Sequence, residues 1–294
     1  MQTHKARKKG LLIVLSGVLL ISFDALLIRL SAVSNWDVVF WRGLLMFLSL
    51  SAILGLRDRR GPLKSLHSGG KPALLSAVFF GLGGLLFVSS VVFTKVANTV
   101  VIISLSPLFA AVFTWLFRIE TIPLRTWLAI IAAFLGVLFV FWGSLGQGGL
   151  VGDLIAVAAA MNIGGNLTLL RQNPGLDRLP LVCMGGLIMA LLALPLAEPF
   201  SLGMHSFLPL AIMGLAQMPA ALVLIGQSTR YLPSAEVSLF LLVETVCSPI
   251  WVWLVIGEEP PPATFIGGSL IIVTLVLYFR MSLQAMERST CGHS

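Results

Sequence analysis

Long apolar runs alternate with short polar or basic segments along the whole 294-residue chain. A helix needs about 20 apolar residues to cross the roughly 30 Å hydrocarbon core of a bilayer. The runs therefore predict an all-α membrane protein with ten transmembrane helices. They lie near 11–30, 38–56, 73–94, 98–117, 125–143, 150–170, 180–197, 206–228, 234–256 and 263–280.

The second half of this pattern repeats the first. Shifting the first five runs by 138 residues brings their starts close to those of the last five, and it superposes Trp115 on Trp253 and Glu120 on Glu258. We therefore predict two five-helix repeats, residues 1–147 and 148–294. Because five is odd, the second repeat begins on the opposite side of the membrane, so the halves are expected to be inverted copies.

Composition and charge agree with a membrane protein. The chain is 57% hydrophobic and 11% charged, against about 45–50% and 25% in soluble domains. With the N-terminus in the cytoplasm, 16 of the 19 Lys and Arg residues fall on the cytoplasmic side, as the positive-inside rule requires. Both termini are thus predicted to be cytoplasmic. The net charge of +7 follows these loops, which argues against a nucleic-acid partner.

Glu244 lies near the middle of the ninth predicted helix. An ionisable group is costly at that depth and is expected to face the bundle interior. Ser248 and Trp251 follow on the same helical face, although Trp251 also suits an anchor at the outer interface. Two interpretations of Glu244 stay open: a neutral carboxyl that fastens a neighbouring helix, or a group that binds substrate.

Asp24 and Arg42 fall at comparable depth in the first two predicted helices, which are antiparallel neighbours. They form either a structural ion pair or a charged gate. In the second case Arg42 would bind a substrate carboxylate through its bidentate guanidinium.

Three amides also fall at mid-membrane depth. Asn162 and Asn166 share a face of the sixth helix, and Gln217 lies in the eighth. Such amides either hold helices together or offer donors and acceptors to a polar ligand.

Glycines and prolines interrupt several of the apolar runs. Gly81 and Gly83 in the third helix, and Pro107, Pro219 and Pro249 in later ones, are candidate hinges or helix breaks. The alternative for the glycines is close helix packing.

Catalysis is not expected. All four histidines lie in predicted loops or tails, and there is no phosphate-binding loop or Cys-x-x-Cys motif. The sequence thus predicts no enzyme, no metal centre and no cofactor. Its expected partners are a small-molecule substrate and the lipid bilayer; the oligomeric state is not determined by the sequence.

The fourth and ninth helices each contain a Ser-Pro pair and close on a glutamate, over Ser106–Glu120 and Ser248–Glu258. With ten spans in two halves, the chain resembles the drug/metabolite transporter superfamily, and within it the EamA-type exporters. It is most similar to bacterial aromatic amino-acid exporters.

This resemblance implies an inner-membrane exporter of amino acids or similar metabolites that works by alternating access. The implied central cavity is lined by helices one, three, four, six, eight and nine. Candidate substrate-binding residues at suitable depth are Phe79, Phe80, Ile102, Asn162, Gln217 and Glu244. A proton-coupled drug or nucleoside-type exporter is the alternative carrier, and a channel is the alternative class.

Overall fold

The computed structural model describes residues 4–58, 61–94, 96–141, 149–198, 203–257, 259 and 262–291. Glu258, which closes the second motif, lies outside these ranges. Over the described residues the chain is helical and contains no strand. Seven helical segments are long and apolar enough to cross a membrane, and three shorter apolar helices cover 124–139, 178–193 and 265–278. The predicted all-α class is confirmed; the count of ten crossings stays a prediction.

Several predicted spans consist of more than one helix. The first comprises α1 (His4–Ile21) and α2 (Asp24–Ser31), the fourth α6 (Val96–Ile103) and α7 (Ser106–Leu116), and the ninth α13 (Ser234–Leu241) and α14 (Glu244–Ile256). In the eighth, α11 (Met204–Ile212) passes through the π-helix η1 (Met213–Gln217) into α12 (Met218–Ser228). The remaining helices are α3 (Asn35–Asp58), α4 (Gly61–Ser68), α5 (Gly70–Phe93), α8 (Leu124–Phe141), α9 (Leu150–Gln172), α10 (Arg178–Ala193) and α15 (Pro262–Cys291).

The 138-residue shift holds in the backbone. It carries both ends of α6 onto those of α13, and it carries the first residues of α7 and α8 onto those of α14 and α15. The two-residue breaks at 104–105 and 242–243 therefore occupy the same position in each half. A break is a conformational feature that apolar sequences do not share by chance, so it supports the repeat more strongly than residue identities do.

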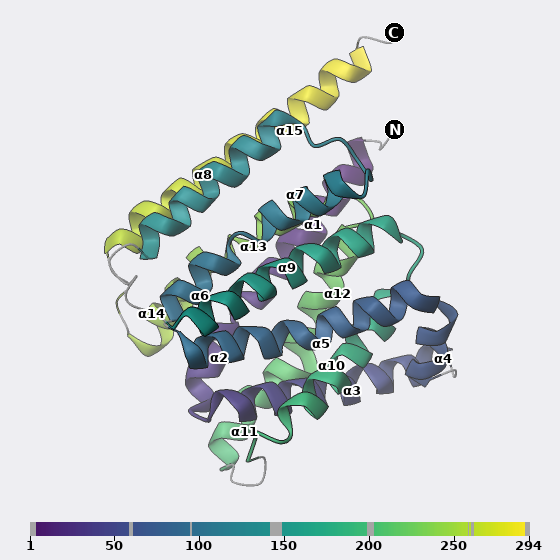
Figure 1. The fold of residues 1–294 in the computed structure, drawn as a ribbon, viewed down its shortest axis with the longest axis vertical. Coiled ribbons are helices and arrows are strands. Elements are labelled where there is room, and N and C mark those ends of the chain that lie inside the picture. Colours follow the sequence, from purple (N-terminus) through teal and green to yellow (C-terminus); the bar gives the residue numbers. More distant parts are fainter. Residues whose placement is uncertain are drawn as a thin grey trace.

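Several of the main contacts between helices also follow the 138-residue repeat: exchanging each helix of a pair for its equivalent in the other half gives a pair that is also in contact. α3 packs on α10 and α8 on α15, while the contact of α5 with α9 is matched by that of α12 with α1. Figure 1 shows α8 and α15 side by side along one edge of the bundle, and it shows α1 beginning and α15 ending at the same end of the molecule. We call this end the N-terminal end of the bundle.

Two glycines set the close contact of α3 and α10. A Cβ atom on Gly43 would lie 2.7 Å from the carbonyl oxygen of Gly186, and one on Gly186 would lie 2.8 Å from that of Gly43. Both distances are too short for any side chain. Small residues let membrane helices approach to the point where their backbones touch, and the two halves are joined here in this way.

Candidate functional site

The first span bends at Ser22 and Phe23, between α1 and α2, and α14 packs against the bend. Ser248 donates its hydroxyl to the Ser22 carbonyl at 2.9 Å, and Trp251 donates its indole N–H to the Ser22 hydroxyl at 2.9 Å. The rings of Phe23 and Trp251 stack with centroids 4.6 Å apart. Trp251 is thus an internal contact, not only an interface aromatic as its position suggested.

Gln217 reaches the same bend from the last residue of η1. Its Nε2 donates to the Leu20 carbonyl at 2.8 Å, and the residue is only 6% exposed. Its Oε1 is buried and accepts no hydrogen bond from the described residues.

Asp24 begins α2 and forms an ion pair with Arg42 of α3. The distance from Arg42 Nη1 to Asp24 Oδ2 is 3.1 Å. The guanidinium passes over Gly84 of α5, where a Cβ atom would lie 2.8 Å from Nη2. Asp24 Oδ1 and Arg42 Nε are buried without a hydrogen-bond partner among the described residues. The pair is therefore intact, but neither side chain has its hydrogen bonds complete.

Glu244 is the first residue of α14 and directly follows the break at 242–243. It is partly exposed, and it interacts electrostatically with Asp24 and Arg42. A helix N-terminus favours a negative charge, which suits a carboxylate there. The side chains of Asp24, Arg42, Gln217 and Glu244 thus gather around the first-span bend, and we call them the elbow cluster.

A cavity of about 510 Å³ lies between α5, α7 and α9. Its walls are almost entirely apolar, and they include Phe79, Phe113, Phe117, Met161 and Asn162. Asn162 is 8% exposed and donates to the Phe79 carbonyl at 2.9 Å. Sequence reasoning missed Phe113 and Phe117. The signal was a phenylalanine at every fourth position, at Phe109 and Phe113 of α7 and at Phe117 directly after it.

Other predicted substrate-binding residues lie away from this cavity. Asn166 accepts a hydrogen bond from Ser76 of α5 at 2.7 Å, which fastens α9 to α5. Phe80 packs against Gly185 of α10. Ile102 lies in the last turn of α6, where its carbonyl accepts from the N–H of Leu105 across the break.

The predicted hinges differ in their surroundings. α5 continues unbroken past Gly81 and Gly83; Gly81 packs against Ile188, and a Cβ on Gly83 would lie 3.3 Å from Asn162 Nδ2. Pro107 and Pro219 lie in the first turns of α7 and α12, just after the break and the π-helix. Pro107 is tolerated because the first turn after a break has no internal partner for a backbone N–H, whereas Pro219 lies within the continuous helix formed by α11, η1 and α12. Pro249 lies inside α14.

Comparison with known proteins decides the family. The model of the EamA-like transporter family matches residues 8–142 and again residues 150–280. The chain belongs to the EamA-like transporter family. A solved structure described only as the crystal structure of a protein has the same fold, with a TM-score of 0.80 and 16% identity over 96% of this chain and 99% of that one. Among curated proteins, none matches the chain.

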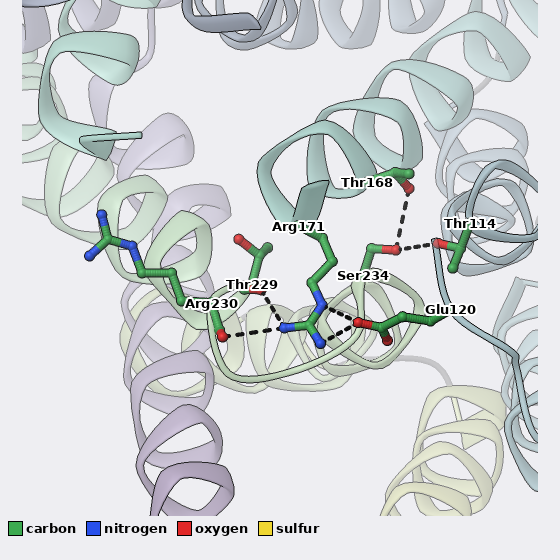
Figure 2. Close-up of polar contacts among 7 residues, drawn as sticks. All are labelled: Thr114, Glu120, Thr168, Arg171, Thr229, Arg230 and Ser234. Atoms are coloured by element: carbon green, nitrogen blue, oxygen red, sulfur yellow. Dashed lines mark hydrogen bonds and ion pairs between the residues drawn. The ribbon is translucent and has the colours of Figure 1, made fainter. Parts of the chain in front are cut away.

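In this EamA-like transporter a second polar cluster joins the halves at the C-terminal ends of α7, α9 and α12 (Figure 2). Arg171 of α9 forms an ion pair with Glu120, its Nε lying 2.6 Å from Oε1, and it also donates to the carbonyls of Thr229 and Arg230 at 3.1 and 3.2 Å. Beside it, Ser234 is hydrogen-bonded to both Thr114 and Thr168.

These contacts place the guanidinium of Arg171 between the turn after α7 and the turn after α12. Arg118, two residues before Glu120, has φ of +51°, which is a costly conformation for a residue with a side chain. The turn is therefore held in a strained shape that presents Glu120 to Arg171.

We expect Arg171→Glu and Glu120→Arg each to destabilise the transporter by roughly 1–3 kcal/mol, because like charges then meet and the carbonyl contacts are lost or disturbed. The double variant should regain part of this loss, since opposite charges are restored. Thermal unfolding in detergent, followed by fluorescence, measures both effects. Additive losses in the double variant would show that the two side chains do not interact.

Proposed function

We propose that this transporter exports amino acids, including aromatic ones, or similar small metabolites across the bacterial inner membrane by alternating access. The observation that carries the proposal is that an aromatic cavity and a charged cluster lie beside adjacent residues of α5. A Cβ atom added to Gly83 would lie 3.3 Å from Asn162 Nδ2 of the cavity wall, and one added to Gly84 would lie 2.8 Å from Arg42 Nη2 of the elbow cluster. A ligand with an apolar body and a charged end matches this combination.

The size and lining of the cavity support the same ligand class. A volume of about 510 Å³ falls within the range for small-molecule sites. Phe79, Phe113 and Phe117 offer ring surfaces, which favour offset or edge contacts with an aromatic side chain. Asn162 supplies a polar group at the inner wall.

The repeat supports alternating access. Two inverted halves place equivalent helices on either side of a central site, and rocking of one half against the other exposes that site to each side in turn. Contacts that exchange partners between halves fit this arrangement. We also infer ten crossings with both termini in the cytoplasm. α1 begins and α15 ends at the same end of the bundle, and the Lys and Arg distribution assigns that side to the cytoplasm.

The test is counterflow of labelled phenylalanine into proteoliposomes preloaded with unlabelled phenylalanine. Gly165→Leu fills the cavity, where an added Cβ meets nothing closer than 3.6 Å, so the helix should fold normally. We expect saturable counterflow in the parent protein and at least a tenfold lower rate in Gly165→Leu.

The matched control is Gly55→Leu on α3, where an added Cβ has nothing within 4 Å. It should transport at the parent rate. Unchanged counterflow in Gly165→Leu would remove the cavity from the substrate route. A strict need for a pH gradient would favour the proton-coupled alternative, and conductance without saturation would favour a channel.

A further inference from the structure

We propose that the elbow cluster binds one monovalent cation, held by Asp24 Oδ1, Gln217 Oε1 and the Glu244 carboxylate. The ligand is either an alkali cation such as Na⁺ or a primary ammonium group. In its ammonium form, the proposal rests on the transport function proposed above, because the ammonium group would belong to the substrate.

The first argument is the sum of charges. With both carboxyls ionised, Asp24 and Glu244 contribute two negative charges and Arg42 contributes one positive charge. Arg29, also on α2, is exposed, and Cys247 of α14 is the other titratable group that interacts with Glu244. In that ionisation state the formal side-chain charges of the cluster sum to −1 inside the membrane, where isolated charges are costly. One monovalent cation brings the sum to zero.

The second argument is the kind of atom left without a partner. Asp24 Oδ1 and Gln217 Oε1 are both buried acceptors without a donor. Gln217 is more than nine-tenths buried, and its Nε2 is already held by the Leu20 carbonyl, so its amide oxygen faces away from that bond. Buried acceptors left unsatisfied cost free energy, and a cation satisfies them where an anion cannot.

The third argument is the backbone. α1 ends one residue before Ser22, and α13 ends two residues before Val243, so both helices direct their carboxyl ends towards the two breaks. Carbonyls at a helix C-terminus favour positive charge nearby. Carbonyls at both breaks already accept hydrogen bonds within the protein, so they act through the helix dipole and not as ligands of the cation.

Trp251 provides a reporter, because it stacks on Phe23 next to Asp24. The experiment titrates the purified full-length protein with sodium chloride or 2-phenylethylammonium chloride, each compared with choline chloride at equal ionic strength. Tryptophan fluorescence is one readout, and the melting temperature is the second. We expect a saturable response to at least one of the two cations and none to choline. Sodium alone would identify an inorganic cation site; the amine alone would identify an ammonium site.

Gln217→Leu and the isosteric Glu244→Gln should each weaken this binding at least tenfold. Asp153→Asn is the control, because Asp153 bonds to Thr94 at the start of α9, away from the cluster. Trp251→Phe should change the fluorescence response but keep the shift in melting temperature. The site would be overturned if the protein showed no cation-specific response. It would also be overturned if Gln217→Leu and Glu244→Gln bound the cation as tightly as the parent protein. The measurement involves no transport, so its failure is distinguishable from failure of counterflow.

Discussion

Replacing Arg178 by leucine is expected to be one of the two most destabilising single substitutions proposed for this protein. Arg178 is completely buried at the start of α10. Its guanidinium donates to the carbonyls of Leu170, Asn173 and Gly226 at 2.8, 3.0 and 3.1 Å, and to the hydroxyl of Thr229. These carbonyls lie at the ends of α9 and α12, where the helices have no N–H of their own to offer.

Leucine would leave several buried acceptors without a donor, each worth about 1 kcal/mol or more, so we expect a loss of at least about 3 kcal/mol. Lysine should not rescue it, because one ammonium cannot span the fork of acceptors that guanidinium reaches. Arg57→Leu is the control: Arg57 pairs with neighbouring Asp177, but its side chain is 46% exposed, and exposed pairs contribute little. Equal melting temperatures for Arg178→Leu and Arg57→Leu would contradict this role.

Removing Arg42 alone should be almost as damaging. In Arg42→Leu the Asp24 carboxylate stays buried without its counter-charge, and breaking a buried pair from one side costs about 3–5 kcal/mol. The double variant Asp24→Asn/Arg42→Gln removes both charges and should recover most of the lost stability. Thermal unfolding measures the recovery.

Transport separates the structural role of this pair from its functional one. If the pair only stabilises the fold, the recovered double variant should show normal counterflow. We expect counterflow to stay at least tenfold below that of the parent, because the charged end of the ligand then lacks its partners. Normal transport in a stable double variant would leave the pair a structural role alone.

The helical class and the repeat were predictable because they depend on composition and spacing over long windows. The breaks were not. Leu242 and Val243 form a break inside an uninterrupted apolar run, while the equivalent break at 104–105 is followed by Pro107. With no proline or glycine at 242–243, the bend there depends on packing against other helices, which no local signal records.

The structural roles of two arginines could not be predicted by counting the charges of the loops. Arg171 and Arg178 both raise the positive charge assigned to the cytoplasmic loops, yet the structure uses them to satisfy carbonyls at helix ends. The elbow cluster was only partly predictable. Polar residues inside apolar runs identified Asp24, Gln217 and Glu244 one by one, but their convergence on the Ser22 bend requires the tertiary fold.

The π-helix at Met213–Gln217 has a consequence for how the eighth span tolerates change in chain length. A π turn holds one residue more than an α turn, so the segments on either side are out of phase by about 100°, the rotation per residue of an α-helix. Deleting one residue within it would let the span relax into an uninterrupted α-helix and would turn Gln217 away from Leu20 without altering a single functional side chain. The orientation of Gln217 therefore depends on how many residues the eighth span contains as well as on which residues they are.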